Sequence, residues 1–73
     1  MPSLPVVSGG EVVKALQYLG FVVMRRRGSH IILRNGSRVC VVPNHQELDV
    51  GTLRGLLKQA EVSIREFLDA LNI

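Results

Sequence analysis

Apolar residues recur at the spacing of one helix face in three parts of the chain. The first part lies between Ser8 and Gly20, the second covers residues 50–60, and the third begins at Ser63. Ser8 and Ser63 are each followed by a glutamate three residues later, which is the spacing of a helix-capping box. The apolar stripes are Val12, Val13, Leu16 and Leu19, then Leu53, Leu56 and Leu57, then Ile64, Phe67, Leu68 and Leu71. We expect three helices whose stripes form the core rather than a seam for a partner.

Strand-forming residues dominate the segment between the first two predicted helices. The runs cover residues 21–27, 30–34 and 38–42. The first run ends in three arginines, and Pro43 stops the third. The dipeptides Gly28–Ser29 and Asn35–Gly36 separate the runs and predict two tight hairpin turns, the first with glycine in the leading position of a type II′ turn. The pattern predicts a meander of three antiparallel strands.

The predicted elements follow the order α-β-β-β-α, with a further short helix at the C-terminal end. Amphipathic helices in a small domain must cover the sheet, so we expect an α+β fold in which helices back a three-stranded antiparallel sheet. This is the plan of the double-stranded-RNA-binding domain. We expect residues 1–73 to form a single domain, with residues 1–7, which contain two prolines, as a loose N-terminal lead-in.

Composition narrows the class of protein. Hydrophobic residues make up 47% of the chain, which favours a packed globular domain over a disordered one. The single cysteine, Cys40, excludes an internal disulfide and a cysteine-based zinc site, and we expect a reduced, cytoplasmic protein. No apolar run is long enough to span a bilayer, and the first residues lack the basic start of a secretory signal.

The basic residues are gathered in one part of the chain. The net charge is only +3, yet the segment from Val12 to Gln46 contains six Lys or Arg residues and no acidic residue. The six are Lys14, Arg25, Arg26, Arg27, Arg34 and Arg38. A region with one sign of charge is typical of a surface that binds a polyanion such as RNA. A solvated basic face is the simpler alternative.

His30 is the candidate catalytic residue. A two-residue turn at Gly28–Ser29 places Arg27 opposite His30. Strand alternation puts His30, Ile32 and Arg34 on one face, and Ile31 and Leu33 on the other. RNA carries its own nucleophile, the 2′-hydroxyl group, so cleavage needs a group that moves a proton and cations that stabilise the charge at phosphorus. His30 can move the proton, and Arg27, Arg25 or Lys14 can supply the positive charge. From geometry alone, however, a single histidine near a turn is more often a surface or packing residue.

Other chemistries have less support in the sequence. His45, in the polar loop after the strands, is the only other histidine, and no HExxH or CxxC motif is present, so we expect no metal site. The sequence also lacks a glycine-rich phosphate loop, so we expect no nucleotide cofactor. The aromatic residues Tyr18, Phe21 and Phe67 form no row of stacking platforms on the strands, which favours recognition of RNA through its backbone and shape.

Several segments together resemble one protein family. They are Ser8–Leu16 (SGGEVVKAL), Leu19–Phe21 (LGF), Arg27–His30 (RGSH), Val41–His45 (VVPNH) and Gly51–Ala60 (GTLRGLLKQA), in this order. From Ser8 to Leu71 the chain resembles the HicA family of type II toxins. The resemblance implies a double-stranded-RNA-binding-like fold, cleavage of messenger RNA, and neutralisation by a HicB-type antitoxin. It also implies that the histidine of the Gly-Ser-His motif, here His30, is catalytic. The chain departs from the family at Gly10, where a basic residue is frequent, and at Glu61, where glycine is frequent.

The main hypothesis is a cytoplasmic endoribonuclease toxin that cleaves messenger RNA without a metal or other cofactor. His30 acts as its general acid or base, and a HicB-like antitoxin masks the face that carries His30. One alternative is a non-catalytic RNA-binding module that uses the same basic hairpin. Another is a protein-interaction domain whose hairpin docks an acidic partner. The residues expected to bind RNA are Lys14, Arg25, Arg26, Arg27, Ser29, Arg34 and Arg38.

Overall fold

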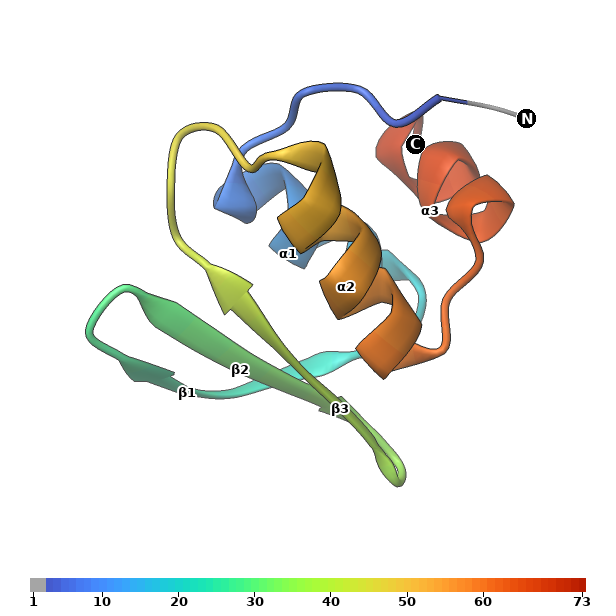
Figure 1. The fold of residues 1–73 in the computed structure, drawn as a ribbon. Coiled ribbons are helices and arrows are strands. Elements are labelled where there is room, and N and C mark those ends of the chain that lie inside the picture. The colour runs from blue at the N-terminus through green and yellow to red at the C-terminus, as the bar shows by residue number, and fades with distance from the viewer. Residues whose placement is uncertain (1–2) are drawn as a thin grey trace.

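A computed structural model describes residues 3–73, which form three helices and three strands (Figure 1). In chain order they are α1 (Gly9–Tyr18), β1 (Val22–Arg27), β2 (His30–Asn35), β3 (Arg38–Pro43), α2 (Val50–Ala60) and α3 (Ile64–Leu71). This order confirms the predicted α+β fold, and each predicted helix and strand is present. Within residues 3–73, every helix is too short or too polar to span a bilayer.

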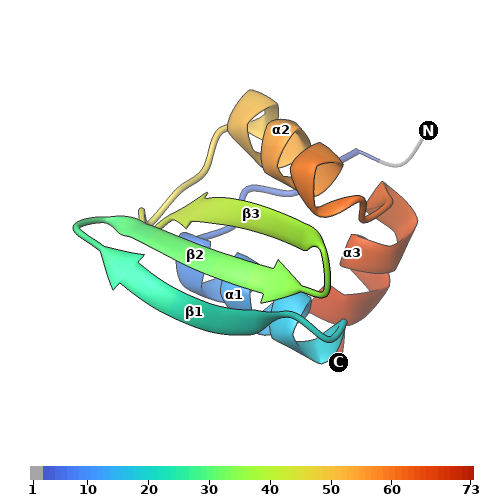
Figure 2. The same ribbon diagram turned by 90° about the horizontal axis from the view of Figure 1, so that it is seen from below.

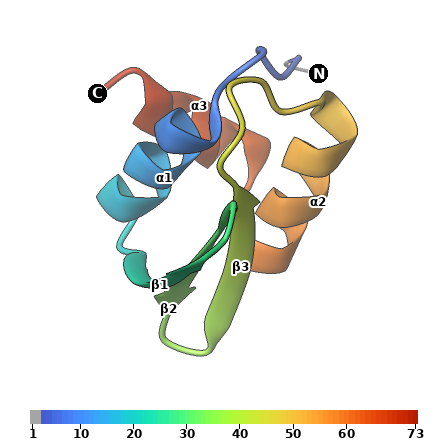
Figure 3. The same cartoon turned by 90° about the vertical axis from the view of Figure 1, so that its left-hand side faces the viewer.

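The helices cover one face of the sheet and leave its other face open. The strands are antiparallel in the order β1-β2-β3, and Figure 2 and Figure 3 show α1 and α2 on the same side of them. The covered face of the sheet contributes Ile31, Leu33, Cys40 and Val42 to the core, and each is at most 3% exposed. Burial raises the pKa of the Cys40 thiol to about 11. Cys40 therefore stays protonated and acts as a small apolar strand residue.

Side-chain caps determine where the helices begin. The two predicted capping boxes, at the starts of α1 and α3, are both present. Asp49 caps α2, because its carboxylate accepts a hydrogen bond from the backbone N–H of Thr52 at 2.7 Å. This bond and a second from the Thr52 hydroxyl group lower the pKa of Asp49. At the other end of α2, Glu61 adopts a φ of 56°, in the left-handed region where glycine is favoured.

The second hairpin turn is at Gly36–Ser37, so the predicted turn at Asn35–Gly36 is wrong by one residue. Asn35 pairs with Arg38 in the sheet, which leaves only Gly36 and Ser37 in the loop. Gly36 has a φ of 62°, and a type II′ turn requires a positive φ at its first central residue. The side-chain amide of Asn35 instead donates a hydrogen bond to the carbonyl oxygen of Leu19 at 3.4 Å, just past the end of α1.

The corrected turn moves β3 by two residues relative to β2. A turn at Asn35–Gly36 would pair His30 with Val41, whereas the observed register pairs His30 with Pro43. A shift of two residues leaves each side chain on its predicted face. It does, however, bring the loop that follows β3 next to His30.

The N-terminal lead-in is less loose than predicted. Residues 3–7 belong to no helix or strand, but Leu4 and Val7 are buried in the core. The backbone N–H of Leu48 also donates a hydrogen bond to the carbonyl oxygen of Val7 at 2.8 Å. These apolar contacts and this bond fix the segment against the loop before α2. Residues 1 and 2 of the predicted lead-in lie outside the described residues.

Gly9, the first residue of α1, lies against the loop after β3. Its backbone N–H donates to the carbonyl oxygen of His45 at 2.8 Å. A β-carbon added to Gly9 would lie 2.9 Å from the Cα of Asn44 and would also overlap the carbonyl oxygen of Pro43. We expect Gly9→Ala to lower the free energy of unfolding by about 1–3 kcal/mol, because backbone atoms must move to admit the methyl group. Urea unfolding of the purified protein measures this change.

Gly10→Ala is the matched control for this prediction. The nearest atom to a β-carbon added at Gly10 is the Ser8 hydroxyl oxygen at 3.8 Å, which is an ordinary contact distance. The higher helix propensity of alanine should leave the stability unchanged or raise it by up to about 1 kcal/mol. Equal stability of the two variants would contradict a close backbone contact at Gly9.

Candidate active site and nucleic-acid interface

His30 lies on the open face of the sheet, at the start of the central strand β2, with β1 on one side and β3 on the other. Residues that pair directly across antiparallel strands place their side chains on the same face. His30 pairs with Arg27 on β1 and with Pro43 on β3. Along β2, buried residues alternate with exposed or half-buried ones, and His30 is exposed. The predicted pairing of Arg27 with His30 and the predicted division of β2 into two faces are confirmed.

A bulge in β1 decides which arginines stand on the open face. The register shifts between Val23 and Arg25, so that Met24 is an extra residue with no partner in β2. Val23 pairs on the core side, whereas Arg25 pairs with Ile32 on the open side. Without the bulge, the same hairpin pairing would turn Val23 outward and Met24 toward the core. The bulge therefore lets Val23 face the core while Arg25 and Arg27 stand on the open face.

Three segments that are distant in the sequence meet around the tip of the β1–β2 hairpin. The backbone N–H of Asn44 donates to the carbonyl oxygen of Ser29 at 2.6 Å, and that of Gly9 donates to the carbonyl oxygen of His45 at 2.8 Å. The hairpin turn, the loop after β3 and the start of α1 are held together by these bonds, and Figure 1 shows all three at the left of the molecule. Ser29 and His30 are both exposed. A large polymer can therefore reach this end of the sheet.

The strands around His30 carry charge of one sign. None of the three strands contains an acidic residue. Arg27 is opposite His30, and Arg25 is two positions farther along β1, about 7 Å away. Arg26 pairs with Ile31 and so faces the helix side, but it is exposed at the end of the sheet. Within residues 3–73, no group of three or more His, Cys, Asp or Glu side chains is placed to hold a metal ion.

Arg34 and Arg38, two of the predicted RNA-binding residues, lie at the other end of the sheet and bind backbone. Arg34 is four residues along β2 from His30, about 13 Å away, and its Nε donates to the carbonyl oxygen of Gly36 at 2.7 Å. The guanidinium group of Arg38 donates at 3.4 Å to carbonyl oxygens at the C-terminal end of α2. It also lies over the ring of Phe21, 5.4 Å from the ring centre. These contacts support a turn and a helix end, away from His30.

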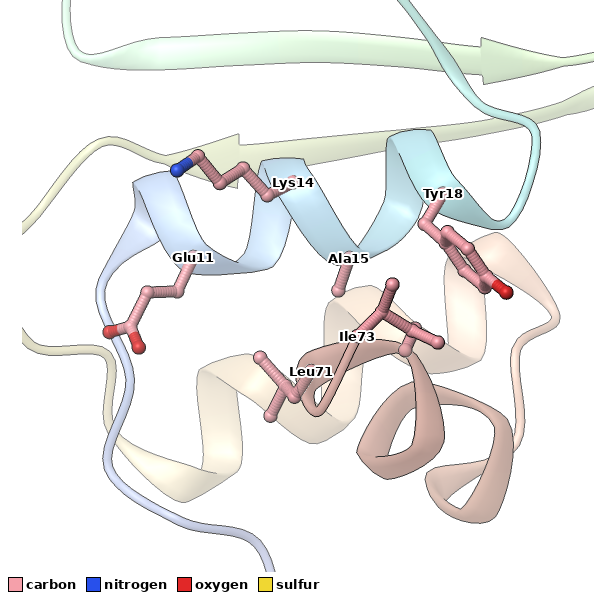
Figure 4. A pocket seen from close by; sticks show the side chains of 7 residues that line it. Glu11, Lys14, Ala15, Tyr18, Leu71 and Ile73 are labelled. Carbon is pink, nitrogen blue, oxygen red and sulfur yellow. The ribbon is translucent and has the colours of Figure 1, made fainter.

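Lys14 lies on α1 and is separate from the arginines of the open face. Figure 4 shows its side chain extending back toward the start of the helix. Together with Glu11, Tyr18 and Leu71, among others, it lines a pocket of about 430 Å³ between α1 and α3. No residue that lines this pocket is a histidine or belongs to the sheet. The pocket is therefore distinct from the surface around His30.

No role is predicted for His45 from the sequence. The structure places its backbone against α1, two residues after the partner of His30 on β3. The signal for this placement was present in the sequence. A hairpin counted from a turn at Gly36–Ser37 ends with Pro43 beside His30, and His45 follows in the same segment.

Exposed apolar residues share the open face with the arginines. Val22, Met24, Val39 and Val41 are each at least 38% exposed. Val39 and Val41 pair with β2 residues of the open face, and so does Val22. An exposed apolar patch bordered by charged residues is typical of a surface that binds another macromolecule.

The family comparison covers the elements that build this surface. The family model described as the HicA toxin of bacterial toxin–antitoxin systems matches residues 9–62, which is more than half of the chain. A search of curated proteins found no match. The matched residues run from the start of α1 through α2 and include the whole sheet. The chain therefore belongs to the HicA family, the toxins of bacterial toxin–antitoxin systems.

Proposed function

We propose that this HicA-family toxin is an endoribonuclease that cleaves messenger RNA without a metal ion, with His30 as a general acid or base. One observation carries the proposal. His30 is exposed and pairs with Arg27 on a sheet face whose strands contain no carboxylate. A proton-transfer group beside an unneutralised cation is the minimum that RNA cleavage requires of a protein.

The reaction uses the 2′-hydroxyl group of RNA as the nucleophile. The 2′-oxygen forms a bond to phosphorus and loses its proton, while the bond from phosphorus to the 5′-oxygen breaks and that oxygen gains a proton. The products are a 2′,3′-cyclic phosphate and a 5′-hydroxyl group. The negative charge that develops on the phosphoryl oxygens is stabilised by Arg27, the cation nearest to His30 along the sheet.

The remaining cations have different parts in this proposal. Arg25 and Arg26, exposed near the same end of the sheet, bind the phosphate backbone together with the turn residue Ser29. Lys14 binds the phosphate backbone from the side of α1. Arg34 and Arg38 serve the fold, because their guanidinium groups donate to backbone carbonyl oxygens at the far end of the sheet.

A HicB-type antitoxin is the expected protein partner of a HicA toxin. The open face suits an acidic protein, since exposed valines such as Val39 and Val41 lie beside arginines and no strand carries an acidic residue. A protein docked there covers His30. Docking of an acidic antitoxin would then also mask the catalytic residue. The hypothesis of a protein-interaction domain is therefore compatible with the hypothesis of a nuclease.

Incubation of the purified protein with RNA in the presence of a metal chelator tests the proposal. We expect the RNA to be cut, while a DNA strand of the same sequence is bound but stays intact, because DNA lacks the 2′-hydroxyl group. RNA that remains intact after long incubation, with binding that weakens as salt rises, would identify a non-catalytic RNA-binding module instead.

A further inference from the structure

We propose that His45 is the second proton-transfer group of the active site and acts on the opposite side of the scissile phosphate from His30. This inference rests on the proposed nuclease function and adds a residue to it. The chain contains only two histidines. The fold brings the segments that carry them to the same end of the sheet, although they are fifteen positions apart in the sequence.

The backbone limits the distance between the Cα atoms of the two histidines. Pro43 pairs with His30 across β2 and β3, so their Cα atoms are about 4.5–5.5 Å apart. His45 follows two residues later, and two peptide units span at most about 7.6 Å. The Cα atoms of His30 and His45 are therefore at most about 13 Å apart. Two imidazole side chains across such a gap can contact one phosphodiester group between them.

Hydrogen bonds hold this loop in place on both sides. The N–H of Asn44 donates to the carbonyl oxygen of Ser29, the residue before His30, at 2.6 Å. The N–H of Gly9 donates to the carbonyl oxygen of His45 at 2.8 Å, and Gly9 lacks the β-carbon that would push the loop away. The fold thus uses the backbone of His45, while its side chain is exposed. An exposed side chain on a fixed backbone is available for chemistry.

The chemistry requires two proton transfers at different oxygens. One group takes the proton from the 2′-hydroxyl as the 2′-oxygen bonds to phosphorus, and the other gives a proton to the 5′-oxygen as its bond to phosphorus breaks. Two of the carboxylates near this loop are occupied by helix capping: Glu11 accepts from the N–H of Ser8 at 2.9 Å, and Asp49 accepts from the N–H of Thr52 at 2.7 Å. The third, Glu47, is exposed and is therefore tested by substitution. We assign His30 as the base that takes the proton from the 2′-hydroxyl group and His45 as the acid that gives a proton to the 5′-oxygen.

A substrate with a sulfur leaving group tests this assignment. We expect His45→Ala to slow cleavage of ordinary RNA by about 10²-fold or more. Replacing the 5′-oxygen of the cleaved bond with sulfur removes the need for an acid, because a thiolate leaves without a proton. His45→Ala should then cut this substrate at nearly the wild-type rate, whereas His30→Ala should remain slow. Glu47→Gln, a change of the exposed carboxylate in the same loop, is the control and should keep the wild-type rate on both substrates.

The outcomes separate this inference from the function on which it rests. Wild-type rates for His45→Ala on ordinary RNA, with His30→Ala inactive, would overturn the role of His45 and leave the nuclease proposal intact. A slow His45→Ala variant that the sulfur substrate does not restore would overturn its role as the acid. A wild-type protein that cuts neither substrate would overturn both proposals. Thermal unfolding of each variant confirms that it remains folded.

Discussion

His30→Ala is expected to reduce the rate of RNA cleavage by about 10²–10⁴-fold, the usual contribution of a proton-transfer group. His30 is exposed at the start of β2 and is not one of the core residues. The variant should therefore fold and still bind RNA through its arginines. Cleavage is measured with purified protein at saturating concentration. Expression of the variant in growing bacteria should no longer arrest their growth.

Val39→Thr is a suitable control for this experiment. Val39 lies on the open face but at the end of the sheet far from His30, where it pairs with Arg34. The substitution should leave the cleavage rate within a few-fold of wild type, which shows that loss of activity is specific to His30. Growth arrest of undiminished strength from His30→Ala would remove His30 from the mechanism.

Phe67→Ala should have the largest effect on stability. Phe67 is the largest of the fully buried side chains, with no exposed surface, and it belongs to α3, which packs against α1. Truncation of a buried phenylalanine costs about 3–5 kcal/mol, and a domain of this length has a total stability of roughly 4–11 kcal/mol. The variant should therefore lose at least about a quarter of the total stability and unfold at a clearly lower denaturant concentration than the wild type. Chemical denaturation monitored by circular dichroism measures the loss.

This prediction also tests whether α3 belongs to the folding unit. The HicA family model matches residues 9–62, so all of α3 lies beyond it. Arg65→Ala, at an exposed position of the same helix, should change the stability by less than about 0.5 kcal/mol. If Phe67→Ala were equally mild, α3 would be dispensable for the core.

The helices could be predicted well because their signals are local. Ser8 and Ser63 each make the capping box that their spacing indicates, and the large buried side chains of each helix belong to its predicted apolar stripe. The small residues Ala15, Ala60 and Ala70 are buried as well, outside the predicted stripes. The hairpin turns show where local signals are insufficient. Asn35–Gly36 and Gly36–Ser37 both suit a tight turn. In the observed turn, at Gly36–Ser37, the Asn35 side chain donates a hydrogen bond to the carbonyl oxygen of Leu19, which is far away in the sequence.

The candidate site was predictable only in part, for the same reason. The pairing of Arg27 with His30 follows from the short turn between them, so the sequence was sufficient. The bulge at Met24, which turns the half-buried Val23 toward the core, has no signal of its own in the residues nearby. Placing His45 required the register of β3, and the structural use of Arg38 required the position of α2. Each of these depends on packing between elements that are distant in the sequence.

Analysis of the ends of cleaved RNA tests the central claim most directly. Wild-type protein is incubated with RNA in the presence of a chelator, and the new termini are identified by mass spectrometry. If His30 promotes attack by the 2′-hydroxyl group, every cut leaves a 2′,3′-cyclic phosphate on one fragment and a 5′-hydroxyl group on the other. Fragments with a 3′-hydroxyl group and a 5′-phosphate would show that water is the nucleophile and would contradict the mechanism proposed for this toxin.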